Sequence, residues 1–230
     1  MRSMEIHRVA RTHQQARLSY DSLSRWYDLL SGASERKYKE KGLELLHVRE
    51  GERVLEIGSG TGACLNRLSE AAGDQGLVAG IDLSPGMLRV ALRKLKPHRS
   101  LRPVRFTKTV RLAGLVCSDA LGLPFPAASF DALFLSFTLE LFDTPEIPLA
   151  LAECRRVLKA GGRLCVVSLA KKDTWVVRLY ERIHDLWPAA VDCRPIYPAQ
   201  ALAEAGLHIE QVVEMLMFGL PVEVVLALRG

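Results

Sequence analysis

The sequence lacks any apolar run close to the ~20 residues that a membrane-spanning helix requires, so no transmembrane segment is expected. It also lacks the apolar stretch of a secretory signal peptide, because Met1 to Arg17 is polar and basic. The five cysteines lie far apart and form no C-x-x-C pair, so zinc and redox motifs are not expected. Scattered single cysteines are typical of the reducing cytosol. These absences predict a cytoplasmic protein with no metal site.

Acidic residues are missing from one long window, Leu83 to Ser118, although the window contains nine arginines and lysines. The whole chain carries a net charge of +5 at 230 residues. A basic cluster of this kind attracts phosphate-bearing partners, either nucleic acid or the head groups of an anionic membrane. The alternative interpretation is a solvated basic helix followed by a loop. The length suits one sizeable core with additions.

The centre of the chain is a glycine-rich turn between a strand and a helix. Val54–Ile57 is a short apolar run that suits a buried parallel strand, and a helical pattern begins at Ala63. Between them Gly58, Gly60 and Gly62 alternate. Glycine is needed where the backbone takes positive φ or where a ligand must touch the main chain. Such a turn predicts a nucleotide-type site at the carboxyl edge of an open α/β sheet.

Two acids accompany this turn. Glu56 ends the first strand, and Asp82 closes a second apolar run at 78–81, about 20 residues beyond the glycines. A carboxylate in that position suits a ribose diol, because it accepts hydrogen bonds from two vicinal hydroxyls. Residues 58–63 also fit the loose dinucleotide fingerprint G-x-G-x-x-[GA]. A dehydrogenase and a purely structural turn therefore remain alternatives at this point.

The remaining elements predict the fold class. Apolar runs indicate further strands at 76–81, 115–117, 130–135 and 163–169. Helical patterns fall between them at 63–72, 84–96 and 146–158, the last with a glycine C-cap at 161–162. Two runs at 208–215 and 222–228 are separated by a link too short for a crossover helix, which predicts an antiparallel pair. We therefore expect an α/β, Rossmann-like, doubly wound seven-stranded sheet, mostly parallel with a C-terminal antiparallel strand pair.

Residues 1–47 predict an N-terminal helical cap with helices at 18–31 and 34–47. Tyr20 and Tyr27 share one helix face because they lie seven residues apart. Two tyrosines on one face would either close over a ligand or pack against the sheet.

The remainder, 48–230, predicts a single domain with two insertions. The first is the basic insertion 96–112. The second, 171–199, contains His184 and suggests a lid over an apolar substrate, or else a helix that covers the sheet edge. The aromatic side chains of this second insertion are Trp175, Tyr180, Trp187 and Tyr197.

These motifs resemble those of class I S-adenosylmethionine-dependent methyltransferases. Residues 54–62 are similar to motif I of that superfamily, and residues 80–88 are similar to its second motif. Segments within 119–131 and 151–164 resemble the later motifs, so the similarity covers roughly residues 45–230. Within the superfamily the chain is most similar to the ubiquinone/menaquinone biosynthesis C-methyltransferases, the methyltransferase type 11 group. The dehydrogenase interpretation becomes a distant second.

The resemblance implies S-adenosylmethionine as cofactor and S-adenosylhomocysteine as product. It implies that Asp82 holds the ribose hydroxyls and that Glu56 lies near the amino group of the cofactor. The residues that it assigns to cofactor binding are Glu56, Gly58, Ser59, Gly60, Gly62, Asp82, Leu83, Met87, Asp119, Ala120 and Ser136.

One departure from the quinol-methylating pattern lies after the fourth strand. Members that act on quinol rings typically carry Phe-Gly-Leu-Arg-Asn there, whereas residues 137–141 read Phe-Thr-Leu-Glu-Leu. A carboxylate at Glu140 would suit a cationic or amine acceptor, or would act as a base. The alternative is that Glu140 is a surface residue or a helix-capping residue with no role in the reaction. Candidate catalytic residues are therefore Glu140, His184 and Tyr27.

We hold three functional hypotheses. The first is methyl transfer to a small apolar or amphipathic acceptor such as a lipid, a quinone-like molecule or an amine. The second is an RNA or protein methyltransferase that uses the basic segment 89–111, although no separate recognition domain supports nucleic acid as a partner. The third is a non-catalytic cofactor-binding protein. For the first, we expect a monomer or homodimer in the cytoplasm, with peripheral contact to an anionic membrane surface as an option.

Overall fold

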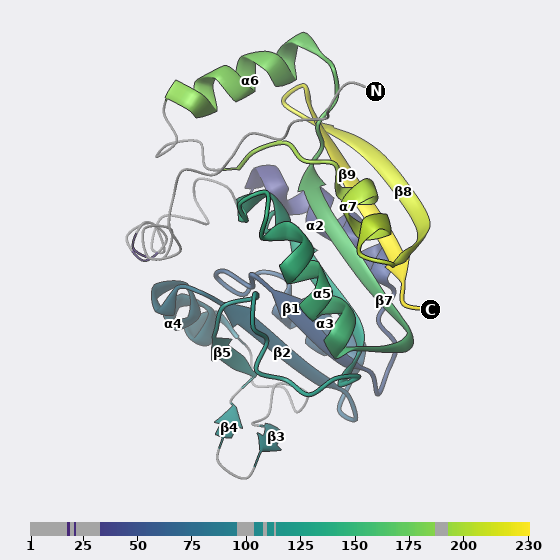
Figure 1. Ribbon diagram of the computed structural model, residues 1–230. Helices are drawn as coiled ribbons and strands as arrows, with labels where there is room; N and C mark the ends of the chain where they lie inside the picture. The colour runs from purple at the N-terminus through teal and green to yellow at the C-terminus, as the bar shows by residue number, and fades with distance from the viewer. Residues whose placement is uncertain are drawn as a thin grey trace.

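The computed structural model describes residues 18, 21, 33–95, 104–107, 110–112, 114–186 and 193–230 (Figure 1). Its helices are α2 Ala33–Leu46, α3 Leu65–Ala72, α4 Pro85–Lys94, the 3-10 helix η3 Leu139–Leu141, α5 Ile147–Val157, α6 Trp175–Leu186 and α7 Pro198–Glu204. Its strands are β1 Arg53–Ile57, β2 Leu77–Asp82, β3 Val104–Thr107, β4 Val110–Leu112, β5 Leu115–Cys117, β6 Phe130–Ser136, β7 Leu158–Leu169, β8 His208–Met217 and β9 Leu220–Leu228.

Seven of the strands form one sheet in the order β5-β2-β1-β6-β7-β9-β8. The pairs from β5 to β7 are parallel, and β9 pairs antiparallel with both β7 and β8. A two-residue turn, Phe218–Gly219, joins β8 and β9, and a link of that length permits only an antiparallel pair. The predicted fold class is therefore confirmed.

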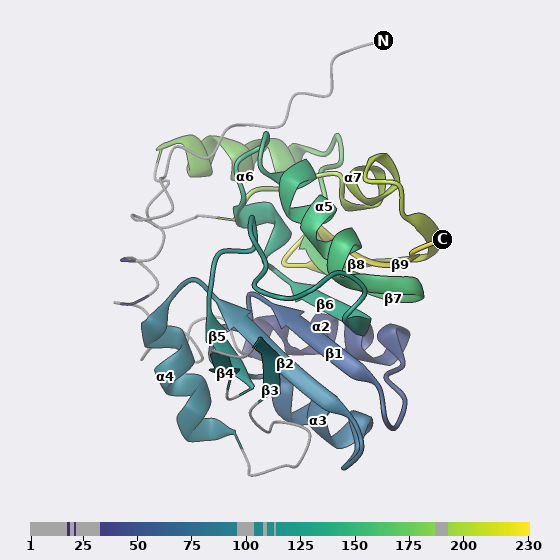
Figure 2. The same ribbon diagram turned by 60° about the horizontal axis from the view of Figure 1, so that its bottom comes forward.

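Helices cover both faces of the sheet (Figures 1 and 2). On one face α5 and α7 pack against Leu55 and Ile57, and on the other α2 and α3 pack against Val54 and Phe134. The alternate side chains of β1 are thus buried on both sides, as expected for a central parallel strand. Gly42 brings α2 close to the sheet, because a Cβ there would lie 2.6 Å from Cγ2 of Val167.

Two segments differ from the elements expected from the sequence. The sequence indicated no strand in the basic insertion 96–112, and β3 and β4 form a short antiparallel pair within it. The predicted glycine C-cap after α5 is wrong, since β7 begins at Leu158 directly after the helix. Gly161 and Gly162 instead pair with Arg229 at the end of the chain, where the Gly161 N–H donates to the Arg229 carbonyl at 2.8 Å. Backbone pairing across the sheet therefore decides this segment.

Of the predicted N-terminal cap, the second helix is α2, whereas Tyr20 and Tyr27 lie outside the described residues. The Tyr38 hydroxyl of α2 donates to the Leu216 carbonyl of β8, so α2 is attached to the far edge of the sheet. None of the described helices is long and apolar enough to cross a membrane. Within the same residues no cluster of His, Cys, Asp and Glu is arranged to hold a metal ion.

Candidate active site

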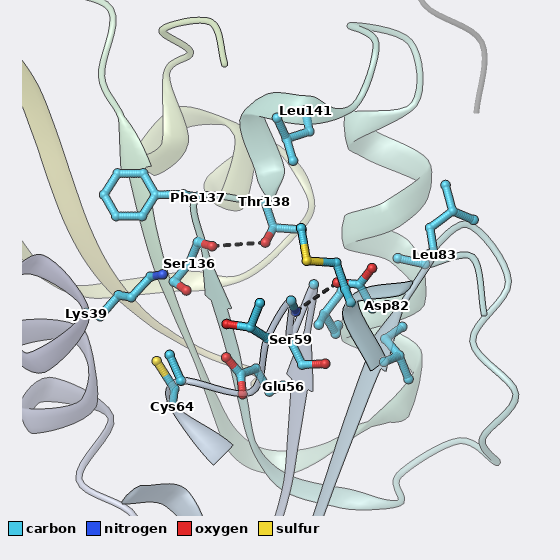
Figure 3. Close-up of a pocket in the computed structure, with 18 of the residues that line it drawn as sticks. Lys39, Glu56, Ser59, Cys64, Asp82, Leu83, Ser136, Phe137, Thr138 and Leu141 are labelled. Carbon is cyan, nitrogen blue, oxygen red and sulfur yellow. Dashed lines mark hydrogen bonds between the residues drawn. The ribbon is translucent and has the colours of Figure 1, made fainter. Parts of the chain in front are cut away.

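A cavity of about 580 Å³ lies at the carboxyl ends of β1, β2 and β6 (Figure 3). The helix α2, the glycine-rich turn, the end of β2 and the segment after β6 form its walls. Its volume is in the range of small-molecule and cofactor sites. Because parallel strands end at the same edge of the sheet, residues far apart in the sequence meet here.

The Asp82 carboxylate fixes the glycine-rich turn. Its Oδ2 accepts a hydrogen bond from the Gly60 N–H at 2.8 Å, and its Oδ1 accepts one from the Ser84 N–H at 2.8 Å. The pKa of Asp82 is raised above its ordinary value, because burial and the nearby Asp21 outweigh the two N–H donors, which lower it. Since a carboxylate has about four lone-pair sites, further acceptor capacity remains for hydroxyl groups of a ligand.

Asp21 joins this site from the N-terminal segment. Its Oδ1 accepts hydrogen bonds from the Ser84 hydroxyl at 2.5 Å and from the Gly86 N–H at 2.7 Å. The Ser84 hydroxyl in turn accepts from the Met87 N–H at 3.1 Å and caps α4. Asp21 thus holds the start of α4 beside the cavity, a role that no local sequence signal indicated.

The Glu56 carboxylate is buried at the inner end of the cavity. Burial raises the pKa of Glu56 to about 8, Lys39 opposes that shift, and Asp82 adds to it. Within the described residues, its Oε2 and the Ser59 hydroxyl have no hydrogen-bond partner. Unsatisfied buried polar atoms cost free energy, and a ligand ammonium placed beside them would recover it. These atoms therefore fit the amino-acid end of an S-adenosylmethionine molecule.

Lys39 of α2 points into the same cavity toward Ser136 (Figure 3). Its Nζ lies 2.7 Å from Oε2 of Glu35. Burial lowers the pKa of Lys39, but the carboxylates of Glu35 and Glu56 outweigh that effect and raise it. Lys39 is consequently a cation at neutral pH and suits a carboxylate rather than the role of a base.

The structure brings together nearly all the residues predicted to bind the cofactor. Gly62 differs, because its missing side chain makes room for α4, where a Cβ would lie 3.0 Å from Cβ of Ala91. The predicted residues that line the cavity are Glu56, Gly58, Ser59, Gly60, Asp82, Leu83, Met87, Asp119, Ala120 and Ser136.

Two of the three predicted catalytic residues, Glu140 and His184, do not line the cavity. Glu140 is 0% exposed in η3, and its Oε1 accepts a hydrogen bond from the Leu169 N–H of β7 at 3.2 Å. The 3-10 turn directs Glu140 toward β7, whereas Leu141 lines the cavity. His184 is buried on α6 and does not line the cavity either. Tyr27 lies outside the described residues. The geometry therefore does not favour Glu140 or His184 as the base.

A Glu140→Gln variant is expected to flatten the pH dependence of stability. Burial raises the pKa of Glu140 in the folded protein to about 8, above its unfolded value, so ionisation disfavours folding. Glu140 therefore does not reduce the stability of the fold below pH ~4.5. It reduces stability increasingly as the pH rises toward 8, and by no further amount above pH 8. Between pH 5 and pH 8 the free energy of unfolding of the parent chain should fall by roughly 2–4 kcal/mol more than that of the variant, as measured by urea unfolding.

Glu153→Gln is the matched control for this measurement. The Arg156 side chain donates to Glu153 and lowers the pKa of that carboxyl, so Glu153 is already ionised throughout this pH range. Its replacement should shift stability by the same amount at pH 5 and pH 8. A Glu140→Gln variant that folds normally but loses methyl transfer would restore Glu140 as a base.

Comparisons with known proteins agree with this geometry. The model of the ubiE/COQ5 methyltransferase family matches residues 1–192. The chain is similar to the "Ubiquinone/menaquinone biosynthesis C-methyltransferase UbiE" of Teredinibacter turnerae, with 34% identity over 180 residues, 78% of this chain and 66% of that protein. The protein of the same name from Azotobacter vinelandii is 34% identical over 74% of this chain and 61% of its own length. The chain thus matches about two thirds or less of these relatives' length.

Solved structures show the same fold at low identity. A Burkholderia thailandensis 1,6-didemethyltoxoflavin-N1-methyltransferase, solved with S-adenosylhomocysteine, has a TM-score of 0.66 and 18% identity, over 98% of this chain and 93% of that chain. The [4+2]-cyclase SpnF has a TM-score of 0.69 and 19% identity, over 97% of this chain and 99% of that chain. One fold thus carries different chemistries, so function must be argued from the site.

Proposed function

The chain belongs to the ubiE/COQ5 methyltransferase family, and from this premise we propose that it transfers a methyl group from S-adenosylmethionine to a small apolar or amphipathic acceptor. The observation that supports this most is the cavity in which Asp82 and the buried Glu56 lie at the ends of neighbouring strands. The relatives are named for ubiquinone and menaquinone biosynthesis, which favours an acceptor with apolar character.

Different residues of the cavity would bind different parts of the cofactor. Asp82 would accept hydrogen bonds from the ribose hydroxyls, and Leu83 with Met87 would contact the adenine. Glu56 would accept from the ammonium group, and Lys39 would pair with the carboxylate of the same amino-acid end. When bound, S-adenosylmethionine supplies a methyl group on a sulfonium, which is already a good leaving group.

The main task of the protein is then alignment. Positioning an acceptor atom in line with the methyl group can supply several kcal/mol of the barrier. Phe137, Leu141 and Phe142 line the cavity beyond the glycine-rich turn and provide an apolar wall for the acceptor. Such a wall also excludes water from the reacting atoms.

Transfer of a radiolabelled methyl group into a cell extract tests this function. After the reaction the extract is separated into organic, aqueous, RNA and protein fractions, with the Asp82→Ala variant as the control of reduced cofactor binding. Label in the organic fraction supports the proposal. Label in RNA or protein would overturn the acceptor class and direct attention to the basic segment 89–111.

Asp82→Ala is expected to weaken binding of S-adenosylhomocysteine roughly 10- to 100-fold, because a charged acceptor of two hydroxyls is lost. It should also reduce stability, since the Gly60 and Ser84 N–H groups lose their acceptor. Asp131→Ala is the matched control. Asp131 accepts from the Arg53 N–H and from Lys159 Nζ at the opposite end of the sheet. Calorimetric titration should show weaker binding for Asp82→Ala alone, and equal weakening in both variants would contradict the assignment.

A further inference from the structure

The outward face of α6 carries an apolar stripe. Trp175, Leu179 and Ile183 are 70%, 48% and 38% exposed, and their spacing of four places them along one side of the helix. The opposite side packs inward, since Val177 and His184 are buried. The apolar stripe of a surface helix in a globular protein normally faces the core. The helix α6 therefore has a second apolar stripe, which faces the solvent.

The turn between β8 and β9 extends this surface. Phe218 is 87% exposed, and the turn lies against α6, because a Cβ at Gly219 would be 3.6 Å from Cγ1 of Val176. Figure 1 shows α6 and this yellow turn together at one end of the molecule. We call Trp175, Leu179, Ile183 and Phe218 the α6 face. Large exposed apolar side chains that gather in one place mark an interaction site rather than ordinary surface.

Basic residues surround the α6 face. Arg178 and Arg182 are exposed on the same side of the helix as the stripe, and Arg36 and Lys37 of α2 are exposed beside Phe218 in a shared hollow. Among the described residues near them, Asp173 is paired with Arg178 at 3.3 Å, Glu40 with Arg36 at 2.9 Å, and Glu181 of α6 with Lys171 at 2.8 Å. The balance is basic, and exposed pairs of this kind are weak enough to exchange partners.

The hollow that contains Phe218 adjoins the active-site cavity. Arg36 and Glu40 line both that cavity and the hollow that contains Phe218. A molecule held against Phe218 would therefore lie beside side chains that also line the active site.

We propose that the α6 face docks on the surface of an anionic lipid bilayer. Apolar side chains would enter the boundary between head groups and acyl chains, tryptophan would occupy the interfacial level, and the arginines would pair with lipid phosphates. Interspersed basic and apolar side chains complement such a surface, and an apolar acceptor is concentrated there. Docking goes beyond the proposed methyl transfer and can be tested without it.

Co-sedimentation of the full chain with vesicles tests the proposal. Vesicles of phosphatidylcholine alone are compared with vesicles that also contain phosphatidylglycerol. We expect binding to the anionic vesicles, weakened about tenfold or more by Trp175→Glu with Phe218→Glu, and about tenfold by Arg178→Glu with Arg182→Glu. Leu149→Glu is the matched control, because Leu149 is a 57% exposed leucine on α5 outside the α6 face, and it should bind as the parent chain does.

Several results would overturn docking through this face. They are equal binding to neutral and anionic vesicles, equal loss in the Leu149→Glu control, and a loss that follows Arg89→Glu with Arg93→Glu on α4 instead. A dimer in sedimentation velocity that Trp175→Glu with Phe218→Glu dissociates would assign the face to a second copy of the chain. Binding of S-adenosylhomocysteine in solution, measured on every variant, separates the two proposals. Unchanged cofactor binding with lost sedimentation supports docking, and docking without cofactor binding would count against the proposed function alone.

Discussion

Replacement of Gly58 by alanine is expected to destabilise the protein by about 3–5 kcal/mol, the sum of a backbone and a packing penalty. Gly58 has φ of +70°, which an L residue with a side chain rarely adopts. An added Cβ would also lie 2.5 Å from Cγ2 and 2.9 Å from Cβ of Thr138, and would touch its Oγ1. Thr138 is buried and its hydroxyl donates to the Ser136 carbonyl, so it cannot move aside cheaply.

Gly60→Ala separates these two penalties. Gly60 also has positive φ, at +51°, but an added Cβ there would meet nothing within 4 Å. Urea unfolding should therefore show a loss of only about 1–2 kcal/mol for Gly60→Ala. Gly58→Ala should recover part of its loss when Thr138→Ser removes the methyl group that it meets. If the two glycine variants were equally unstable, close packing against Thr138 would not matter.

The pairing of Gly60 with Asp82 explains why much of the site could be predicted. Gly60 follows β1 and Asp82 ends the neighbouring parallel strand β2, and the two strands are in register from Arg53 with Leu77 to Ile57 with Ile81. Once two apolar runs are interpreted as adjacent parallel strands, the groups at their ends must meet at one edge. The meeting of the glycine-rich turn with Asp82 was therefore predictable from local patterns, whereas the other cofactor residues were implied by the family resemblance.

The acceptor side was not predictable in the same way. After β6 the chain leaves the strand through Phe137, which has φ of +50°, a conformation that phenylalanine rarely takes. The 3-10 turn that follows, not the strand alternation, decides that Glu140 faces β7 and Leu141 faces the cavity. Contacts with β7 help to hold that turn, since the Phe137 N–H donates to the Val167 carbonyl at 2.8 Å, and contacts over long sequence distances leave no local pattern.

The contributions of the N-terminal region were also hidden. Lys39 was expected only as part of an amphipathic helix, yet α2 places it in the cavity because Gly42 lets the helix approach β6 and β7. Asp21 caps α4 from a segment more than sixty residues away. Contacts of this kind follow from the tertiary arrangement, although α2 itself was correctly predicted as a helix.

The affinity for S-adenosylhomocysteine is expected to rise about 50-fold between pH 6 and pH 8 and then level off. Burial raises the pKa of Glu56 to about 8 in the ligand-free protein, so the carboxyl is protonated at pH 6. A bound ammonium group favours the carboxylate and lowers the pKa of Glu56 in the complex. Binding below pH 8 must therefore release the proton of Glu56. The affinity rises with pH because less of the ligand-free protein then carries this proton.

Calorimetric titrations in buffers of different ionisation enthalpy measure that proton directly. Close to one proton should be released on binding at pH 6.5, and almost none at pH 9. Glu56→Gln should bind with little dependence on pH and roughly 100-fold more weakly than the parent chain at pH 8, because the buried charge pair is lost.

Glu140→Gln is the matched control, and it makes the assignment specific. Burial raises the pKa of Glu140 to about 8 as well, but its carboxylate contacts the Leu169 N–H of β7 and does not line the cavity. That variant should keep both the proton release and the rise in affinity. Proton release that disappears with Glu140→Gln and persists with Glu56→Gln would place the ammonium group away from Glu56. The two carboxyls share their burial and their pKa, so only their position relative to the cavity can separate the outcomes.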